Sequence, residues 1–451
     1  MDMSWEAISP LVEKVASDER LPSRTDVVVI GGGIAGVSAA YFLAKKGHSV
    51  ALLEKGVVAA EQSSRNWGWC RQQNRDKGEL PLIRHAMTLW DTLSPEVGAD
   101  LSFRRTGLVY VTRDPAELAT WEAWCDMARD YQVGSRMLTA DEAKAMAPGN
   151  TAQNWIGGVY SPQDGRAEPT QAAPRLATAA RNLGVSLHQE CAVRGLETTG
   201  GRISGVVTEK GRIATGAVLC AAGAWASMFC RRHGINLPQA GIRSTVFATT
   251  PAEKVTAGGL VTPEMILTPL PNGGYIIAAQ DRGTVEITPQ GLRYARAFWP
   301  TYQSRRKHLK TGIGRSFFQG PEALYGKWSF DKPTPMEQIR VLAPKPDNRI
   351  VAPALKTLVA AYPALAGIRM ARIWSGWIDS TPDAVPVISA IPQLPGFFIS
   401  AGFSGHGFGI GPAAGRLAAD LVAGDTPIVD PTPFRHSRLV DGTLLGKPGM
   451  I

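Results

Sequence analysis

A strand–turn–helix pattern near the N-terminus constrains the fold of this chain more than any other feature. The segment Val27–Gly56 reads VVVIGGGIAGVSAAYFLAKKGHSVALLEKG: an apolar β-branched run, a glycine turn, an alanine-rich helix and a second apolar run. Gly31, Gly33 and Gly36 have G-x-G-x-x-G spacing. Such a turn lets the main chain approach a pyrophosphate and lets the helix lie close to the strand. The pattern predicts a dinucleotide-binding βαβ unit.

The ends of the predicted helix and of the second strand agree with this interpretation. We expect a helix from about Ile34 to Lys46, with its first N–H groups directed at the pyrophosphate. Gly47 then ends the helix. Glu54 closes the second strand about twenty residues after the turn, where an acidic side chain suits a ribose hydroxyl and argues against NADP. This motif alone does not separate FAD from NAD.

Two later segments favour FAD. The loop Lys55–Gln72 is rich in small and polar residues such as Ser63 and Ser64, where an NAD domain would continue into another βαβ unit. It suits a second wrap around the phosphates and ribityl chain of a long cofactor. The segment Gly201–Trp225 predicts a hairpin and then an apolar strand that stops at Gly223. That strand would be a third strand of the nucleotide sheet, arriving after an insertion.

A glycine-rich loop near the C-terminus supports the same cofactor. Gly396–Gly424 repeats the order strand, glycine loop and helix, with Pro412 expected at the first helical position. A helix start directed at one end of a flat ring would stabilise negative charge on a reduced flavin. No complete second G-x-G-x-x-G is evident, since Thr311–Phe318 lacks the third glycine. The flavin is therefore expected to take its electrons directly from the substrate.

Two further segments complete the pattern: Asp164–Val185, and Arg372–Ile388 with its W-x-G…T-P-D-x-x-P pattern. Together these segments resemble the D-amino acid oxidase (DAO) superfamily of flavoproteins. That superfamily includes glycine oxidase, sarcosine oxidase and D-amino acid dehydrogenase. The resemblance covers most of the chain. It implies an α/β fold (α+β overall), in which a Rossmann-like FAD-binding domain carries an inserted, mainly antiparallel β-sheet substrate domain. The inserted strands are expected at 101–112, 243–250 and 265–280, the last with a hairpin at Asn272-Gly273.

The expected domain boundaries follow from this alignment of motifs. They are an N-terminal extension at 1–24, a discontinuous FAD-binding domain at 25–90, 160–235 and 365–440, a substrate domain at 91–159 and 236–364, and a C-terminal tail at 441–451.

The resemblance also implies the residues that contact the cofactor. FAD is expected to be non-covalent, because Gly376 occupies the place of the flavin-linking cysteine of sarcosine oxidase. The expected FAD-binding residues are Gly31, Gly33, Ile34, Ala35, Gly36, Glu54, Lys55, Ser63, Ser64, Arg65, Asn66, Trp67, Gly68, Val193, Gly223, Trp225, Gly405, His406, Gly407, Phe408 and Gly409.

Five residues are candidates for substrate binding or catalysis. A substrate carboxylate would require a fixed arginine, for which Arg71 is the first candidate and Arg372 the second, although Arg71 suits a surface or phosphate-facing position equally. Trp69, with Trp67, could line the pocket or belong to the core. His406 resembles a family position over the flavin ring, or it satisfies main-chain groups. The strand of Tyr275, the fifth candidate, shows no lysine of the kind that activates oxygen in sarcosine oxidase.

The predicted activity is oxidation of a small amine or amino acid. A neutral amine would pass hydride from its α-carbon to flavin N5, and water would hydrolyse the resulting imine. The missing lysine near Tyr275 favours a dehydrogenase, with a quinone or electron carrier as acceptor, over an oxidase that uses oxygen. Gly409 replaces a carboxylate-binding lysine of sarcosine oxidase, so sarcosine itself is not expected. The alternatives are modification of a tRNA base, and one subunit of a hetero-oligomeric opine or sarcosine oxidase; homo-oligomers are also compatible.

Composition limits other classes of function. The 48 basic and 39 acidic residues give a charge of +9, which we interpret as scattered, with one dense run at Ser304–Lys310 on a solvated helix face. No aromatic-studded basic stripe indicates nucleic-acid binding. Five widely spread cysteines without a CxxC pair indicate neither a zinc site nor a disulfide framework, and no metal is expected.

The N-terminus and the apolar runs indicate a soluble protein. Residues 1–20 contain acids and predict a short amphipathic helix, not a secretory signal. The most apolar run, Gly216–Cys230, is too short to span a bilayer. A cytoplasmic location without a transmembrane segment is therefore expected.

Overall fold

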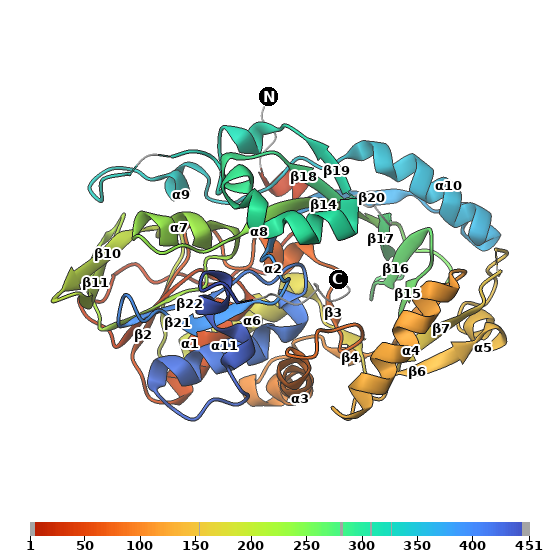
Figure 1. The fold of residues 1–451 in the computed structure, drawn as a ribbon, viewed down its shortest axis with the longest axis horizontal. Coiled ribbons are helices and arrows are strands. Elements are labelled where there is room, and N and C mark those ends of the chain that lie inside the picture. Colours follow the sequence, from red (N-terminus) through yellow and green to blue (C-terminus); the bar gives the residue numbers. More distant parts are fainter. Residues whose placement is uncertain (1–4, 153, 280–282, 307–308, 326, 444–451) are drawn as a thin grey trace.

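A six-stranded sheet forms the first layer of the computed structural model, which describes residues 5–152, 154–279, 283–306, 309–325 and 327–443. Its strand order is β21-β22-β13-β1-β2-β9, parallel except for the edge strand β21. Figure 1 labels β2, β21 and β22 of this sheet. The strands are β1 (Val27–Ile30), β2 (Val50–Leu53), β9 (Ser186–His188), β13 (Ala217–Cys220), β21 (Val387–Ala390) and β22 (Phe397–Ala401). The predicted nucleotide sheet, including its late strand β13 beside β1, is confirmed.

Helices cover both faces of this sheet because β1 and β2 are apolar on both faces and fully buried. One face carries α1 (Ile34–Lys45), α3 (Leu80–Val97), α6 (Pro169–Asn182) and α11 (Gly407–Ala423), which share one apolar core. The other face carries α7 (Ala226–Arg232) and a three-stranded sheet of β10 (Val193–Thr199), β11 (Arg202–Thr208) and β12 (Gly211–Ala214). A Cβ at Gly415 would lie 2.4 Å from Ser38 Cβ, so glycine there allows α1 and α11 to pack closely.

A ten-stranded sheet forms the second layer. Its order is β19-β18-β14-β17-β16-β15-β5-β7-β6, and β20 also pairs with β14. All pairings are antiparallel except β15–β5 and β18–β19, which confirms the predicted mainly antiparallel sheet. The strands are β5 (Leu108–Thr112), β6 (Arg136–Thr139), β7 (Gly157–Ser161), β14 (Ala240–Thr249), β15 (Gly259–Val261), β16 (Met265–Pro269), β17 (Tyr275–Ala279), β18 (Gly283–Glu286), β19 (Leu309–Gly312) and β20 (Met370–Ser380).

Smaller elements connect and cover the two layers. A short sheet of β3 (Trp69–Cys70), β8 (Gly165–Arg166) and β4 (Arg104–Arg105) lies between them. The remaining α-helices are α2 (Gln62–Arg65), α4 (Pro115–Arg129), α5 (Ala140–Ala145), α8 (Pro289–Arg305), α9 (Pro335–Gln338) and α10 (Val351–Ala361). Within the described ranges, no helix combines the length and apolar character needed to cross a membrane.

Three expectations differ from the structure. The prediction of an N-terminal amphipathic helix is wrong for residues 5–20, where the only helical element is a 3-10 turn at Trp5–Ile8. Pro10 lacks an N–H, and the following main chain bonds to Thr170 and Leu187 instead. The predicted strand 101–112 divides, since Gly107, at φ +73°, separates β4 from β5. The helix α11 begins at Gly407, so the placement of Pro412 at its first position is also wrong.

The expected boundary at residue 365 does not coincide with the sheets. The strand β20 lies within the range 365–440 that was assigned to the FAD-binding domain. Its ten partners in β14 place it in the antiparallel sheet. The composition of β20, with two isoleucines and two tryptophans, suits a strand of either sheet, and only its pairing partner decides.

A buried carboxyl group anchors α8 to this second sheet. Glu322 is 3% exposed and accepts a hydrogen bond from Thr288 Oγ1 at 2.8 Å. Its carbonyl accepts from the N–H of Gln290 at 3.1 Å. Burial raises the pKa of Glu322 to about 7. The protonated acid is therefore favoured by folding.

We predict that Glu322→Gln weakens the pH dependence of stability. A raised carboxyl pKa contributes stability that is present below the unfolded-state pKa of 4.5 and is lost as pH rises through about 7. The wild-type free energy of unfolding should fall by about 2–3 kcal/mol more than that of the variant between pH 4.5 and pH 8. Urea unfolding at several pH values measures this, with the exposed Glu122→Gln as control. Parallel pH profiles for wild type and Glu322→Gln would contradict it.

Candidate functional site

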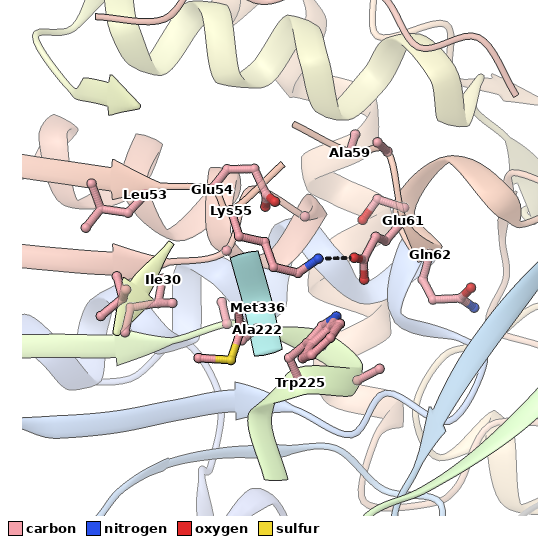
Figure 2. A pocket seen from close by; sticks show the side chains of 18 of the residues that line it. Ile30, Leu53, Glu54, Lys55, Ala59, Glu61, Gln62, Ala222, Trp225 and Met336 are labelled. Carbon is pink, nitrogen blue, oxygen red and sulfur yellow. Dashed lines mark hydrogen bonds and ion pairs between the residues drawn. The ribbon is translucent and has the colours of Figure 1, made fainter. Parts of the chain in front are cut away.

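A cleft lies at the carboxyl ends of β1, β2 and β13, where the parallel strands share one edge (Figure 2). The space between its walls, together with its solvent-filled mouth, is about 800 Å³. Eight residues assigned to FAD from the sequence line it, and these are Gly31, Gly33, Glu54, Lys55, Ser63, Val193, Gly223 and Trp225. The lining also includes residues that sequence reasoning missed, among them Gln62, Ala222, Phe229 and Met336.

The glycine turn at the base of the cleft has no room for side chains. Gly31 has φ +107°, and a Cβ there would lie 2.4 Å from Ala221 O. A Cβ at Gly36 would lie 2.0 Å from Gly31 O. The first helical N–H, that of Ile34, donates to Ser63 Oγ at 2.8 Å. The N-terminus of α1, with the buried Ala35 in its first turn, therefore meets the 55–72 loop beside the cleft, as an anion site requires.

Glu54 is held by two main-chain donors. Its Oε2 accepts from the N–H of Gly32 at 2.7 Å and its Oε1 from that of Gly56 at 2.8 Å. Burial raises the pKa of Glu54, which the two donors oppose. The carboxyl group is thus fixed at the end of β2 with further lone pairs available to a ribose.

Lys55 forms part of the wall of the cleft. Its Nζ donates to Glu61 at 2.6 Å and to the carbonyls of Ile339 and Arg340 at 2.9 Å. The same ammonium lies 4.7 Å from the centre of the Trp225 ring (Figure 2). The ammonium group of Lys55 is therefore already paired with protein groups.

Two buried polar atoms in the cleft have no protein partner among the described residues. They are Gln62 Oε1, an acceptor, and Trp225 Nε1, a donor. Buried polar groups of this kind ordinarily find partners, so a polar ligand is the expected one. With the crowded glycine turn, the fixed Glu54 and the helix terminus at Ser63, these atoms fit the ADP half of FAD.

A second glycine-rich helix start lies beside the two tryptophans of the loop. A Cβ at Gly409 would lie 2.9 Å from Trp69 O and 3.0 Å from Cys70 Cα, so glycine lets β3 pass against the first turn of α11. The Trp67 and Trp69 rings are 4.8 Å apart. Trp69 Nε1 donates to Thr268 Oγ1 of β16 at 2.9 Å. The structure thus brings Trp69 between the helix start and the antiparallel sheet.

Backbone conformation shapes the loop that precedes α11. Gly405 has φ +90°, which a side chain rarely tolerates. A Cβ at Gly407 would lie 2.6 Å from Phe403 Cβ. Phe408 is not beside the cleft: its ring packs 5.5 Å from that of Trp90 in the core between α3 and α11.

His406 and Arg71 are both 6% exposed. His406 Nε2 donates to Glu79 Oε1 at 2.8 Å, and its Nδ1 is buried without a protein partner in the described ranges. Burial lowers the pKa of His406, so the ring is neutral and Nδ1 is an acceptor. Arg71 Nη1 donates to Gln73 O at 2.9 Å and to Tyr110 Oη at 3.1 Å. Glu79 had no local sequence signal.

Several predicted site residues point into the protein. Arg65 donates to Ala60 O, Ser375 O and Ser9 Oγ, and burial lowers its pKa to about 10. Ser64 bonds to Glu61 O. Asn66 closes a local turn by donating to the carbonyls of Gln62 and Ser63 and accepting from Gly68. The structure does not bring these three side chains to the cleft.

Two candidate catalytic residues are likewise engaged elsewhere. Tyr275 is 1% exposed, and its hydroxyl donates to Glu253 O and accepts from Val255 N–H within the core of the second sheet. Arg372 donates to Glu6 O at 2.8 Å and so holds the N-terminal segment. Both roles depend on contacts that are remote in sequence, which a local motif does not reveal.

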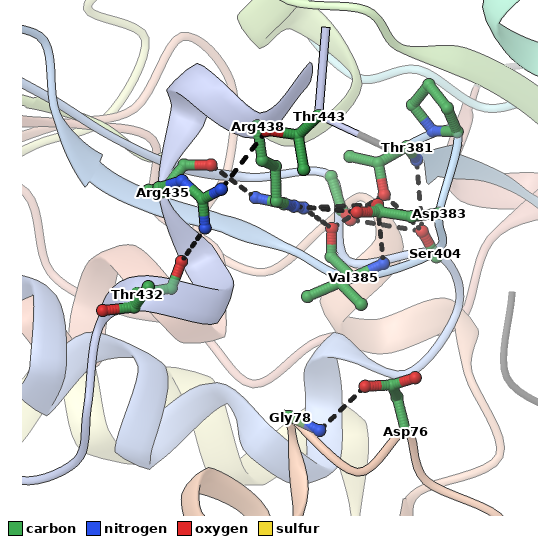
Figure 3. A network of polar contacts seen from close by, with 12 residues as sticks. Asp76, Gly78, Thr381, Asp383, Val385, Ser404, Thr432, Arg435, Arg438 and Thr443 are labelled. Carbon is green, nitrogen blue, oxygen red and sulfur yellow. Dashed lines mark hydrogen bonds and ion pairs between the residues drawn. The ribbon is translucent and has the colours of Figure 1, made fainter. Parts of the chain in front are cut away.

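Polar contacts join the glycine loop before α11 to β20 and to the segment that follows β20, and Figure 3 shows the part of this network around Thr381, Ser404 and Arg438. Asp379 accepts from the N–H of Gly402 at 2.9 Å, and Ser404 Oγ accepts from Thr381 N–H at 3.2 Å. Burial raises the pKa of Asp379 to about 6. Arg438 Nε donates to Asp383 at 2.8 Å. The T-P-D segment is therefore clamped between the loop and the C-terminal turn.

We predict that Arg438→Ala destabilises the fold. Arg438 and Asp383 have side chains 5% and 8% exposed, so the substitution leaves a buried carboxylate without its cation. The free energy of unfolding should fall by about 3–5 kcal/mol. Urea unfolding measures it, and Arg435→Ala, a partly buried neighbour whose hydrogen bonds to Thr432 and Thr443 lie at the surface, should cost only about 1 kcal/mol. Equal losses in the two variants would contradict the importance of this pair.

Comparisons with known proteins place these features in a family. A model of the FAD dependent oxidoreductase family, DAO, matches residues 26–421. The chain is 24% identical over 431 residues to the sarcosine oxidase subunit beta of an Arthrobacter species, covering 94% of this chain and 93% of that protein. It is 26% identical over 438 residues to the glycine oxidase of Geobacillus kaustophilus, covering 92% and 97%.

A solved structure extends the likeness to both sheets. The L-amino acid deaminase of Proteus myxofaciens, in complex with anthranilate, matches with a TM-score of 0.89 and 29% identity over 95% of this chain and 96% of that chain. Within the described ranges no cluster of three or more His, Cys, Asp or Glu side chains is placed to hold a metal ion. The family model covers well over half of the chain, and it implies FAD as cofactor. The chain therefore belongs to the DAO family and is an FAD-dependent amino-acid or amine oxidoreductase.

Proposed function

We propose that this protein uses non-covalently bound FAD to oxidise the Cα–N bond of an α-amino acid. The observation that carries the proposal is the likeness to the Proteus L-amino acid deaminase, which extends over 95% of this chain. The relatives named sarcosine oxidase and glycine oxidase also take substrates with both an amine and a carboxylate. The substrate would lose a hydride from Cα and a proton from nitrogen to give an imino acid, which water converts to a 2-oxo acid and ammonia.

The cofactor would lie along the carboxyl edge of the parallel sheet. Glu54 would bind the ribose, and the glycine turn with Ser63 would bind the pyrophosphate. The helix start of α11 would stabilise negative charge at the far end of the ring system. When bound, FAD accepts the hydride from the substrate.

The protein groups beside α11 would bind and orient the substrate. Arg71 is the proposed carboxylate anchor, because its guanidinium group is buried and a planar donor pair suits a carboxylate. It donates to Tyr110, whose ring lies 6.5 Å from that of Trp69. Trp67 and Trp69 would exclude water from the reacting carbon. Neutral His406, held through Nε2 by Glu79, would present an acceptor at Nδ1.

Non-covalent attachment is supported by the cysteines. All five are buried, and none is among the residues that line the cleft. Burial raises the pKa of the Cys70 thiol, the cysteine nearest the start of α11, and so suppresses its thiolate. Gly376 lies opposite Gln62, where a Cβ would be 2.3 Å from Gln62 Oε1.

We predict that FAD is released intact by acid denaturation and that Glu54→Ala weakens its binding. The variant leaves the N–H groups of Gly32 and Gly56 without their acceptor and removes the ribose contact, so the Kd for FAD should rise about ten- to hundredfold. Titration of the apoprotein, followed by flavin fluorescence, measures this. Glu54→Gln, which keeps one acceptor, should lose less. Flavin that stays with the denatured chain would contradict non-covalent attachment.

We predict that L-α-amino acids bleach the flavin band under anaerobic conditions. A panel of L- and D-amino acids, N-methyl amino acids and cyclic amines identifies the class, and assays for 2-oxo acid and ammonia confirm the product. Admitting air then distinguishes an oxidase from a dehydrogenase by the rate at which the colour returns. Reduction of the flavin only by amines that lack a carboxylate would contradict the proposal.

Arg71→Met tests the carboxylate anchor. It should lower kcat/KM for the amino acid about a hundredfold or more, but leave the slow oxidation of the matching amine without a carboxylate nearly unchanged. The control is Arg84→Met, an exposed arginine of α3. Equal losses with both substrates would assign Arg71 a structural role instead.

A further inference from the structure

The positive charge of the chain is concentrated in one segment. Residues 287–330 contain eight of the 48 lysines and arginines and one of the 39 acidic residues, which leaves 40 cations and 38 acids in the rest of the chain. The dense run expected at Ser304–Lys310 lies within this segment, and the rest of the chain is close to neutral. The single acid is Glu322, and it is buried against Thr288. The exposed cations of this segment are Arg293, Arg296, Arg306, Lys310, Arg315 and Lys327.

The same segment exposes large apolar side chains. Five of the six most exposed large hydrophobic residues described in the chain lie within it. They are Leu292 at 61%, Trp299 at 56%, Ile313 at 70%, Phe318 at 77% and Leu324 at 77%. Soluble surfaces carry single apolar residues, but a group of this kind marks an interaction surface.

These side chains belong to stretches that meet at the start of α8. Ile287 N–H donates to Gly312 O at 2.8 Å, and Gln290 N–H donates to Glu322 O at 3.1 Å. The strands β18 and β19 run side by side next to it (Figure 1). Along α8, Leu292, Arg296 and Trp299 follow at helical spacing and form one exposed stripe. We call the exposed cations and apolar residues of 287–330 the basic–apolar surface.

We propose that the basic–apolar surface binds the headgroup region of an anionic phospholipid membrane, so that the enzyme is a peripheral membrane protein. Trp, Phe and Leu side chains enter the boundary between headgroups and acyl chains, while neighbouring arginines and lysines bind anionic headgroups. A nucleic acid would use the cations but would leave Leu292 and Leu324 in water. The combination of both features favours the membrane.

Vesicle flotation tests the proposal on the full, FAD-loaded chain and needs no turnover, so its outcome is independent of the proposed substrate. The probes are vesicles of phosphatidylcholine alone, and of phosphatidylcholine with 30% phosphatidylglycerol. We expect binding to the anionic vesicles only, weakened by added salt. Arg293→Gln with Arg296→Gln should lower the partition coefficient about thirtyfold. Trp299→Ser, Phe318→Ser and Leu324→Ser together should abolish binding.

Control variants carry changes of the same kind elsewhere. Arg129→Gln with Arg212→Gln removes two cations whose side chains are 69% and 74% exposed, and Leu11→Ser removes an apolar side chain that is 68% exposed. They should bind like the wild type. The flavin spectrum and Tm of every variant show that it is folded. No binding, equal binding to neutral vesicles, equal losses in the controls, or binding to DNA without binding to vesicles would each overturn the proposal.

Discussion

The close approach of the α1 helix to the ends of β1 and β13 is the constraint on which the cleft depends. Ala221 O occupies the space that a side chain at Gly31 would need, and Gly31 O occupies that of Gly36. With both side chains absent, the N-terminus of α1 lies directly over the strand ends, beside Ser63. A larger residue at either glycine would move the helix away. The partial positive charge of the helix end would then no longer face the pyrophosphate position.

A second helix start is placed at the same edge by the same means. The helix α11 follows β22, and β22, β13 and β1 are parallel neighbours, so α1 and α11 both begin at the carboxyl edge of one sheet. Gly415 lets α11 pack against Ser38 of α1, and Gly409 lets β3 pass its first turn. One sheet edge thus presents two positive helix ends, which suits a long cofactor that carries anionic groups at its middle and, after reduction, at its ring.

The elements built from short motifs could be predicted from the sequence. The partners that single side chains contact in the folded protein could not. The turn between β1 and α1 can be recognised from about thirty residues, because the β-branched runs, the glycine spacing and the acidic residue at the end of β2 all lie within that stretch. Arg65 looked equally suited to a phosphate, but its guanidinium group is taken by Ser375 O and Ser9 Oγ, more than fifty residues away in either case. Met336 reaches the cleft from α9 with no local signal at all. Such contacts depend on the tertiary fold and not on the motif.

Paired strands connect the basic–apolar surface to the cleft, but different side chains form the two regions. The strand β14 pairs with β18 on one side and with β20 on the other, and β20 carries Gly376 opposite Gln62 of the cleft. Changes to the buried residues of this region, such as Glu322, would therefore reach both. Trp299, Phe318 and Leu324 are each more than half exposed, so removing them takes little packing from the fold. Loss of membrane binding in that variant, with the flavin spectrum unchanged, would therefore reflect the surface itself and not a disturbed cofactor site.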